Sequence, residues 1–305
     1  PNAPLIDVLW RAWLRTATGW HDLAITGMSL LSGGAIQQNW RLDVAGQAWV
    51  LRTDAAATLA VSRSRSEEFL LLQAAFAAGV AVPEPLYLCE DPAIIGAPFF
   101  IMRRVEGIAA GHRIVRSETL GGGRVALVES LAIQLARIHS MRPDLPFLGQ
   151  KPLDSGQNFI ATMRRGLDSA QENRPILEWG LRFLERESPG PGEIVMCHND
   201  YRTGNYLVTE TALTGILDWE FAAWGDPHED IGWLFARCWR FGSPHEVGGV
   251  GPRDAFLAAY EAESGRQTEP ARIAWWQIAA AIRWAVIAIA QAQRHVSGQE
   301  PSLEL

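Results

Sequence analysis

The segment 197–220 concentrates the side chains whose types and spacing could do chemistry: His198, Asp200, Asn205 and Asp218. A carboxylate such as Asp200 can accept or orient the proton of an attacking hydroxyl group. The amide oxygen of Asn205 and the carboxylate of Asp218 are hard ligands suited to Mg²⁺. Each residue alone is more often a turn or capping residue. Together they have the order of the catalytic loop and metal-binding aspartate of enzymes that transfer phosphoryl groups.

Two short β-prone runs are expected to position these side chains. Residues 206–208 and 213–217 are separated by Thr209-Glu210-Thr211, which predicts a hairpin. The hairpin would place Asn205 at the start of one strand and Asp218 at the end of the other. We therefore expect the two residues to lie close enough to share bound metal.

The same segment resembles the aminoglycoside phosphotransferase and choline kinase superfamily, which has a protein-kinase-like fold. The resemblance continues in 224–232, where Gly-Asp-Pro-x-x-Asp is similar to the segment after the metal-binding aspartate in that family. Tyrosine and arginine come after the catalytic aspartate, as in the branch that includes kinase-like domains fused to acyl-CoA dehydrogenases. The resemblance therefore implies a protein-kinase-like fold and phosphotransferase activity.

The resemblance also implies roles for single residues. Asp200 would be the catalytic base, Asn205 and Asp218 would hold Mg²⁺, and His198 and Arg202 would support the loop. The chain departs from the usual pattern at Asn199, where glycine or arginine is common in the family. Asparagine tolerates a positive φ better than most residues, so the loop is still expected to form.

The amino-terminal third has features of a nucleotide site. Gly33 and Gly34 precede two strand-like runs, 40–44 and 49–53. Backbone amides in a glycine turn can approach phosphates closely because no side chain blocks them. Paired glycines alone indicate only a loop or hairpin, but here they open the order of strands and helix that a kinase amino-terminal lobe would have.

Kinases use a lysine on the third strand that contacts phosphates and pairs with a helix glutamate. The single lysine of this chain, Lys151, lies far from that region, and Arg52 occupies the matching place. A guanidinium is always charged and can bind phosphate with two donors, although its shape differs from that of an ammonium group. The expected partner on the helix 66–78 is Glu68, with Glu67 as the alternative.

Residues 98–102 predict a buried strand, and 103–107 resemble the family's interlobe hinge. By similarity, the Arg103 carbonyl and the Val105 amide would hold adenine. The implied cofactors are ATP, or another nucleoside triphosphate, and Mg²⁺.

Length and composition agree with two packed units. At 305 residues and 48% apolar content, the chain exceeds what one core usually contains. We expect an α+β, two-lobed protein-kinase-like fold, with a β-rich nucleotide-binding lobe at 1–105 and a helical lobe at 106–305. Helices are predicted in the second lobe at 124–140, 158–168, 176–187, 231–239, 253–264 and near the end of the chain.

The net charge of -7 and the pI of about 5.6 argue against nucleic-acid binding, which needs concentrated positive charge. Three cysteines are too few and too uneven for a disulfide framework, and no secretory signal is visible, so a cytoplasmic location is expected. The apolar stretch 273–290 contains Gln277 and Arg283, which makes a lipid-exposed span costly. We expect a buried helix there and no membrane partner.

Substrate identity is less constrained. Trp219, Glu220 and Trp224 lie near the metal-binding aspartate, and we expect them to line the pocket for the acceptor. Aminoglycosides would need concentrated carboxylates, but arginines and acids are equal in number from Ile231 onward. The resemblance to dehydrogenase-fused domains favours a hydroxyl group on a less charged, acyl-type small molecule.

Three hypotheses remain from the sequence. The favoured one is an ATP-dependent phosphotransferase acting on a small-molecule hydroxyl group. The second is a nucleotide-binding pseudokinase with a regulatory role, suggested by the missing lysine. The third is a metal-dependent hydrolase with His198, Asp200, Asp218 and His228 as ligands, which would leave Asn205 unexplained.

Overall fold

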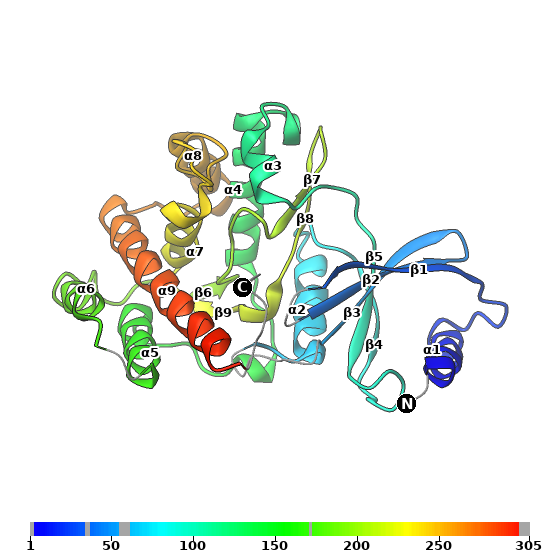
Figure 1. Cartoon of the computed structure of the whole chain (residues 1–305). Coiled ribbons are helices and arrows are strands. Elements are labelled where there is room, and N and C mark those ends of the chain that lie inside the picture. Colours follow the sequence, from blue (N-terminus) through cyan, green and yellow to red (C-terminus); the bar gives the residue numbers. More distant parts are fainter. Residues whose placement is uncertain (1–2, 34–36, 55–61, 171–172, 299–305) are drawn as a thin grey trace.

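The computed structural model describes residues 3–33, 37–54, 62–170 and 173–298, which form two lobes (Figure 1). The amino-terminal lobe is a five-stranded antiparallel sheet in the order β1-β2-β3-β5-β4, flanked by two helices. Its elements are α1 (Ala3–Thr18), β1 (Ile25–Gly33), β2 (Gln37–Val44), β3 (Gln47–Asp54), α2 (Arg65–Ala77), β4 (Pro85–Cys89) and β5 (Phe99–Arg103).

Successive apolar side chains of the central strands point to opposite faces of the sheet, which explains why both faces are covered. On β3, Trp49 and Leu51 pack with α1, whereas Val50 packs with α2. On β5, Phe99 and Ile101 face the α1 side, and Phe100 and Met102 face α2. The helix α1, which was not expected from the sequence, therefore completes one of the two apolar layers.

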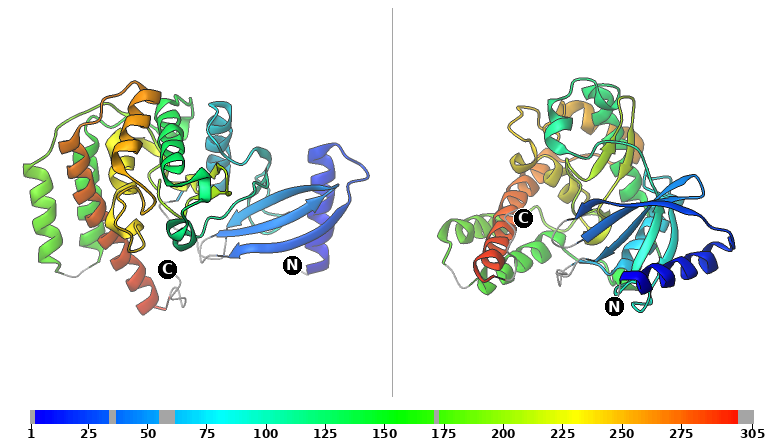
Figure 2. Two further views of the ribbon diagram at one scale, coloured as in Figure 1. Left: turned by 90° about the horizontal axis from the view of Figure 1, so that it is seen from above. Right: turned by 45° about the vertical axis from the view of Figure 1, so that its right-hand side comes forward.

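The carboxy-terminal lobe is mainly helical, as expected (Figure 2). Its helices are α3 (Gly111–Arg116), α4 (Arg124–Ser140), α5 (Ser155–Ser169), α6 (Pro175–Arg186), α7 (Pro227–Leu234), α8 (Arg253–Ser264) and α9 (Pro270–Val296). Its strands form two small antiparallel pairs: β6 (Val195–Cys197) with β9 (Ala223–Gly225), and β7 (Tyr206–Val208) with β8 (Leu213–Ile216). The helix expected at 231–239 instead begins at Pro227 and ends at Leu234, and a separate 3-10 turn covers Arg237–Trp239.

The connection between the lobes is fastened to the second lobe soon after it leaves β5. Ile108 forms an isolated antiparallel bridge with Val208 on β7, and the Thr214 hydroxyl group donates to the Glu106 carbonyl at 2.7 Å. Arg104 is still bonded to β3 through its amide, so this connection passes from one lobe to the other within two residues. The lobes also meet beside α2, where the Ile216 amide donates to the Ala81 carbonyl at 2.7 Å.

The long helix α9 is buried over only part of its length. Its buried residues end at Ile282, and they pack mainly against α7 and also against α5 and α6. Among the described residues it is the one helix that is long and apolar enough to cross a membrane, and a third of its apolar window is buried. The expectation of a buried helix therefore holds for its amino-terminal half and is wrong for the remainder.

Candidate active site

The hairpin β7–β8 holds Asn205 and Asp218 at the same end, as expected from the sequence. Tyr206 pairs with Ile216, and the Leu217 amide donates to the Asn205 carbonyl at 2.8 Å. Asp218 comes directly after it with a left-handed backbone, φ 60°. For a non-glycine residue this conformation costs about 1 kcal/mol or more, and the polar contacts of the Asp218 side chain offset that cost.

Asp200 lies at the centre of the site, where its two carboxylate oxygens have different partners. Oδ1 accepts from Arg202 Nε at 3.1 Å and from Trp233 Nε1 at 2.9 Å. Oδ2 accepts from Asn205 Nδ2 at 2.5 Å. Asn205 also donates to the Asp200 carbonyl at 3.0 Å, so its amide group faces Asp200 and its side-chain oxygen is left for another ligand.

His198 holds the loop from inside, as the sequence suggested. Its Nε2 lies 2.9 Å from the Leu217 carbonyl, and its Nδ1 lies 3.2 Å from the Asp200 amide. Because a carbonyl can only accept and an amide N–H can only donate, these partners fix the neutral tautomer with the proton on Nε2. Burial lowers the pKa of His198, which agrees with a neutral ring.

Asn199 adopts φ 62°, the left-handed conformation that asparagine tolerates. Asp230 on α7 fixes this turn, because its carboxylate accepts the amides of His198 and Asn199, both at 2.7 Å. His139 on α4 donates from Nε2 to the same carboxylate at 3.2 Å and accepts the Tyr260 hydroxyl group at 2.7 Å on Nδ1. The catalytic loop is thus tied to two helices.

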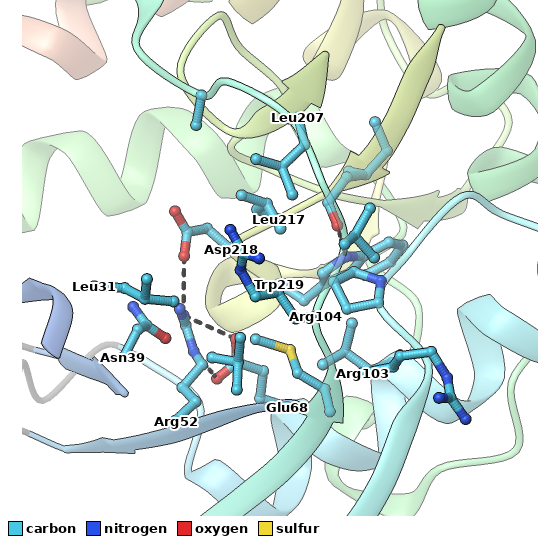
Figure 3. Close-up of a pocket in the computed structure, with 18 of the residues that line it drawn as sticks. Leu31, Asn39, Arg52, Glu68, Arg103, Arg104, Leu207, Leu217, Asp218 and Trp219 are labelled. Carbon is cyan, nitrogen blue, oxygen red and sulfur yellow. Dashed lines mark hydrogen bonds and ion pairs between the residues drawn. The ribbon is translucent and has the colours of Figure 1, made fainter. Parts of the chain in front are cut away.

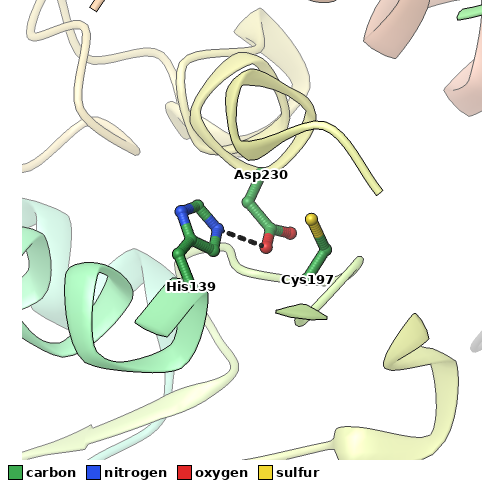
Figure 4. A group of neighbouring side chains, drawn as sticks. All are labelled: His139, Cys197 and Asp230. Atoms are coloured by element: carbon green, nitrogen blue, oxygen red, sulfur yellow. Dashed lines mark hydrogen bonds and ion pairs between the residues drawn. The ribbon is translucent and has the colours of Figure 1, made fainter. Parts of the chain in front are cut away.

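Cys197 completes a buried group with His139 and Asp230 (Figure 4). Burial lowers the pKa of His139 and raises that of the Cys197 thiol. Burial alone would raise the pKa of Asp230, but His139 and the loop amides outweigh it and the pKa is lowered. Since the protein itself satisfies the nitrogens of His139 and the oxygens of Asp230, we interpret this group as an anchor of the loop.

Arg52 connects the amino-terminal lobe to Asp218 across the cleft. Its Nη2 lies 2.9 Å from Glu68 Oε1 and 2.9 Å from Asp218 Oδ1. Glu67 instead closes a capping box with Ser64 at the start of α2, so Glu68 is the partner of Arg52 and the alternative is wrong. Burial alone would raise the pKa of Asp218, but the charge and hydrogen bond of Arg52 outweigh it and the pKa is lowered.

A second buried arginine, which the sequence analysis did not single out, lies behind this contact. Arg65 has no exposed side-chain surface and pairs with Asp54 at 2.9 Å and with Glu68. Its third neighbour is Glu220, at 3.5 Å. Burial, together with the nearby charge of Asp218, raises the pKa of Glu220. The cleft thus contains more carboxylates than cations, an arrangement suited to a divalent cation.

A cavity of about 430 Å³ lies between the lobes beside these charges (Figure 3). Apolar side chains form its inner wall, and Arg52, Glu68 and Asp218 lie at one end. The lining residues from the hinge region are Met102, Arg103, Arg104, Val105 and Gly107.

The hinge presents backbone groups to this cavity. Among the described residues, the Val105 amide donates to no protein acceptor, so it remains available to a ligand. The Arg103 side chain points away and pairs with Glu84 at 2.7 Å, whereas Arg104 points into the cavity (Figure 3). Gly33 ends β1, and Gly34 lies outside the described residues.

The residues that the sequence analysis expected to line the acceptor pocket each have defined contacts in the structure. Trp219 is completely buried, its ring packs on His198 with centroids 5.0 Å apart, and its indole borders the interlobe cavity. Glu220 faces Arg65, and the Trp224 ring lies under the Lys151 ammonium group at 4.6 Å. These contacts identify no acceptor pocket, so the expectation that Trp219, Glu220 and Trp224 line one stays a prediction.

The Oδ1 oxygen of Asp200 is surrounded by aromatic and basic side chains. Trp233 donates to Asp200, and Arg283 on α9 lies 4.5 Å from the centre of the Trp233 ring. Arg202 lies 4.3 Å from the centre of the Trp239 ring. Tryptophans recur after the loop at 219, 224, 233 and 239, but which of them contacts Asp200 depends on the packing of α7.

The ligand set of a metal-dependent hydrolase is not assembled. His198 binds the Leu217 carbonyl, and His228 Nδ1 is bound to Asp226 at 2.8 Å. Within the described ranges, the one group of three or more His, Cys, Asp or Glu residues within metal-binding distance is the loop anchor of His139, Cys197 and Asp230. This geometry gives no support to the hydrolase hypothesis.

The chain matches one protein-family model and is similar to several curated proteins. Residues 27–276 match the model of the phosphotransferase enzyme family. Acyl-CoA dehydrogenase family member 11 of Gallus gallus is 32% identical over 214 residues, covering 66% of this chain and 26% of that protein. Family member 10 of Mus musculus is 28% identical over 229 residues, covering 72% of this chain and 21% of that protein. The chain thus spans about a quarter of the length of these relatives.

Solved structures share the fold. A putative aminoglycoside phosphotransferase from Ralstonia eutropha superposes with a TM-score of 0.75 at 21% identity, covering 98% of this chain and 92% of that one. A thermostable mutant of aminoglycoside phosphotransferase APH(4)-Ia, in a ternary complex with AMP-PNP and hygromycin B, gives a TM-score of 0.62 at 16% identity, covering 92% of this chain and 91% of that one. With 250 residues matched by the family model, this chain belongs to the phosphotransferase enzyme family.

Proposed function

We propose that this protein transfers the γ-phosphoryl group of ATP to a hydroxyl group of a small molecule. The observation that carries the proposal is that Asp200 and Asn205, which are hydrogen-bonded to each other, lie at the same end of the hairpin as Asp218, which lines the interlobe cavity and binds Arg52. Asp200 would orient the acceptor hydroxyl group and take its proton.

Asn205 and Asp218 fit Mg²⁺ by the chemistry of their donors. The Asn205 amide nitrogen is occupied by Asp200, which leaves an oxygen, and the Asp218 side chain is 32% exposed towards the cleft. When bound, the ion would offset charge on the phosphates. Arg52 would hold phosphate oxygens with the guanidinium donors that now bind carboxylates.

The base of the nucleotide would lie in the apolar part of the cavity, against the hinge. The free Val105 amide supports this placement, because a hinge N–H can donate to a ring nitrogen of adenine. The complex of APH(4)-Ia with AMP-PNP, a protein of the same fold, supports a nucleotide in this family.

The surroundings of Asp200 disfavour a polycationic acceptor. Two guanidinium groups, Arg202 and Arg283, lie within 4.5 Å of the centres of the Trp239 and Trp233 rings. These cations and aromatic faces suit a neutral or anionic hydroxy compound better than an aminoglycoside, because like charges repel and the rings offer apolar contact. An acyl-type hydroxy compound is the acceptor class we favour.

Two measurements test the proposal. Calorimetric titration with Mg²⁺ and ATP should show binding. A screen with labelled ATP should then find transfer to a hydroxyacyl compound, a sugar, an amino alcohol or an aminoglycoside, and Asp200→Asn should reduce that transfer by at least about 100-fold without loss of nucleotide binding. Absence of nucleotide binding, or full activity of the Asp200→Asn variant, would refute the assignment.

One observation favours a different outcome. Arg52 replaces the usual lysine and is bound directly to Asp218, the residue that would hold Mg²⁺. Such a contact would suit a regulatory module that binds a nucleotide without transferring its phosphate, because Arg52 occupies the carboxylate that would hold the ion. Tight ATP binding with no transfer to any acceptor of the screen would support this alternative.

A further inference from the structure

We propose that Trp233 is a positioning residue for Asp200, selecting which carboxylate oxygen receives the proton of the acceptor. This inference rests on the proposed function, in which Asp200 is the base. It concerns a residue of α7 that lies outside the catalytic loop and that no family motif in the sequence analysis assigned.

The hydrogen-bond pattern of Asp200 carries the inference. Oδ1 accepts two donors, the indole N–H of Trp233 at 2.9 Å and Arg202 Nε at 3.1 Å. Oδ2 accepts one donor, Asn205 Nδ2. A carboxylate oxygen has two principal acceptor positions, so Oδ1 is saturated and Oδ2 retains one. The geometry assigns Oδ2 as the oxygen that faces the acceptor hydroxyl group.

Trp233 is held so firmly that it can define this orientation. Its side chain is 2% exposed, and its ring makes an edge contact with Trp239 at a centroid distance of 5.1 Å. Arg283 from α9 lies over its face at 4.5 Å. A cation is attracted to the face of an aromatic ring, so Arg283 helps to hold the Trp233 ring in place.

Gly232, the residue before Trp233, lets α7 approach α9 closely. A Cβ atom at Gly232 would lie 2.6 Å from the Trp276 side chain and 2.7 Å from its backbone, so α7 and α9 approach as closely as a glycine allows. The position of the Trp233 indole therefore depends on a tight helix contact.

The same aromatic group also supports the second donor to Oδ1. Arg202 stacks on Trp239 at 4.3 Å while it donates to Asp200. Trp233 and Trp239 thus place both donors on one oxygen. A residue that served only to fill the core would not need its single polar atom aimed at the central carboxylate.

The test compares Trp233→Phe, which removes the N–H and keeps an aromatic ring, with Trp284→Phe. Trp284 belongs to the same aromatic group and contacts Trp239 at 4.9 Å, so it controls for lost packing. We expect Trp233→Phe to lower kcat by about 10- to 100-fold, the effect of losing a hydrogen bond to a charged group. KM for ATP should stay within twofold. The control should change none of these.

A readout without turnover separates this inference from the proposed function. The indole ¹H–¹⁵N resonance of Trp233, identified by its loss in Trp233→Phe, should shift in Asp200→Asn, and the Trp284 resonance should not. If Trp233→Phe does not fold, benzothienylalanine at position 233 keeps the shape of the indole and lacks the donor.

The outcomes are distinguishable. A wild-type protein that transfers phosphate, with a Trp233→Phe variant of unchanged kcat, would overturn the positioning role and leave the proposed function intact. A wild-type protein that transfers nothing would overturn the proposed function, and the resonance of Trp233 would still decide whether its indole holds Asp200.

Discussion

Replacing Arg52 by alanine tests the ion pairs that join the two lobes. The Arg52 side chain is 7% exposed, and its guanidinium group lies 2.9 Å from both Glu68 and Asp218. Removing one partner of a buried pair typically costs about 3 to 5 kcal/mol, because the remaining charge is left uncompensated. We expect a cost of about 3 kcal/mol, the lower end of this range. Glu68 keeps its ion pair with Arg65, and the Asp218 side chain is 32% exposed to solvent.

A loss of about 3 kcal/mol corresponds to a fall in Tm of about 5 °C for cooperative unfolding of a chain of 305 residues, using about 2.1 cal/mol/K per residue for the entropy of unfolding. Arg41→Ala is the matched control, because Arg41 pairs with Asp43 at 2.9 Å but both side chains are at least 35% exposed. An exposed pair of this kind contributes at most about 1 kcal/mol.

Thermal unfolding at pH 7.5, monitored by circular dichroism, measures the difference. The pKa of Asp218 is lowered in the folded protein, so its pairing with Arg52 stabilises the fold above about pH 4 and is lost as the pH falls through the folded pKa. The difference between wild type and Arg52→Ala should therefore shrink in acid. Equal melting temperatures for Arg52→Ala and Arg41→Ala at pH 7.5 would refute the reasoning.

Two further changes probe charges of the second lobe. Asp218→Asn should raise the Kd for ATP at least about tenfold when Mg²⁺ is present and much less when it is absent, because a neutral amide offsets less of the ion's charge; calorimetry with equal affinities in Mg²⁺ would contradict the ligand role. Burial raises the pKa of Glu229 to about 7, so the folded state holds a proton that the unfolded state releases above about pH 4.5, and stability falls as the pH rises from there to 7. Glu229→Gln should remove this loss of at most about 3 kcal/mol. The free energy of unfolding should therefore rise at pH 8 and change little at pH 4.5, and urea unfolding at the two pH values measures both.

The sequence predicted the parts of the site that lie close together along the chain. The order of Asp200, Asn205 and Asp218, joined by a short hairpin, was sufficient to place them at one end of β7 and β8, as the structure has them. The two-lobed fold and the pairing of Arg52 with Glu68 came from the resemblance to kinases, and the structure agrees with both.

Contacts made between distant elements were beyond sequence reasoning. Trp233 meets Asp200 only because α7 packs closely on α9, and Arg65 is enclosed by carboxylates from three separate elements. Proximity in the chain was misleading for Trp219, which is next to Asp218 but turns inward against His198. Periodicity can indicate that such side chains are buried, but it does not give their neighbours.

The attachment of Ile108 to Val208 defines where the chain passes from one lobe to the other. Arg104 is bonded to the smaller lobe and Glu106 to the larger one, so along this connection the change falls at Val105. The Val105 amide is also the group that we expect to meet the purine. A nucleotide bound there would contact the connection itself and stiffen it.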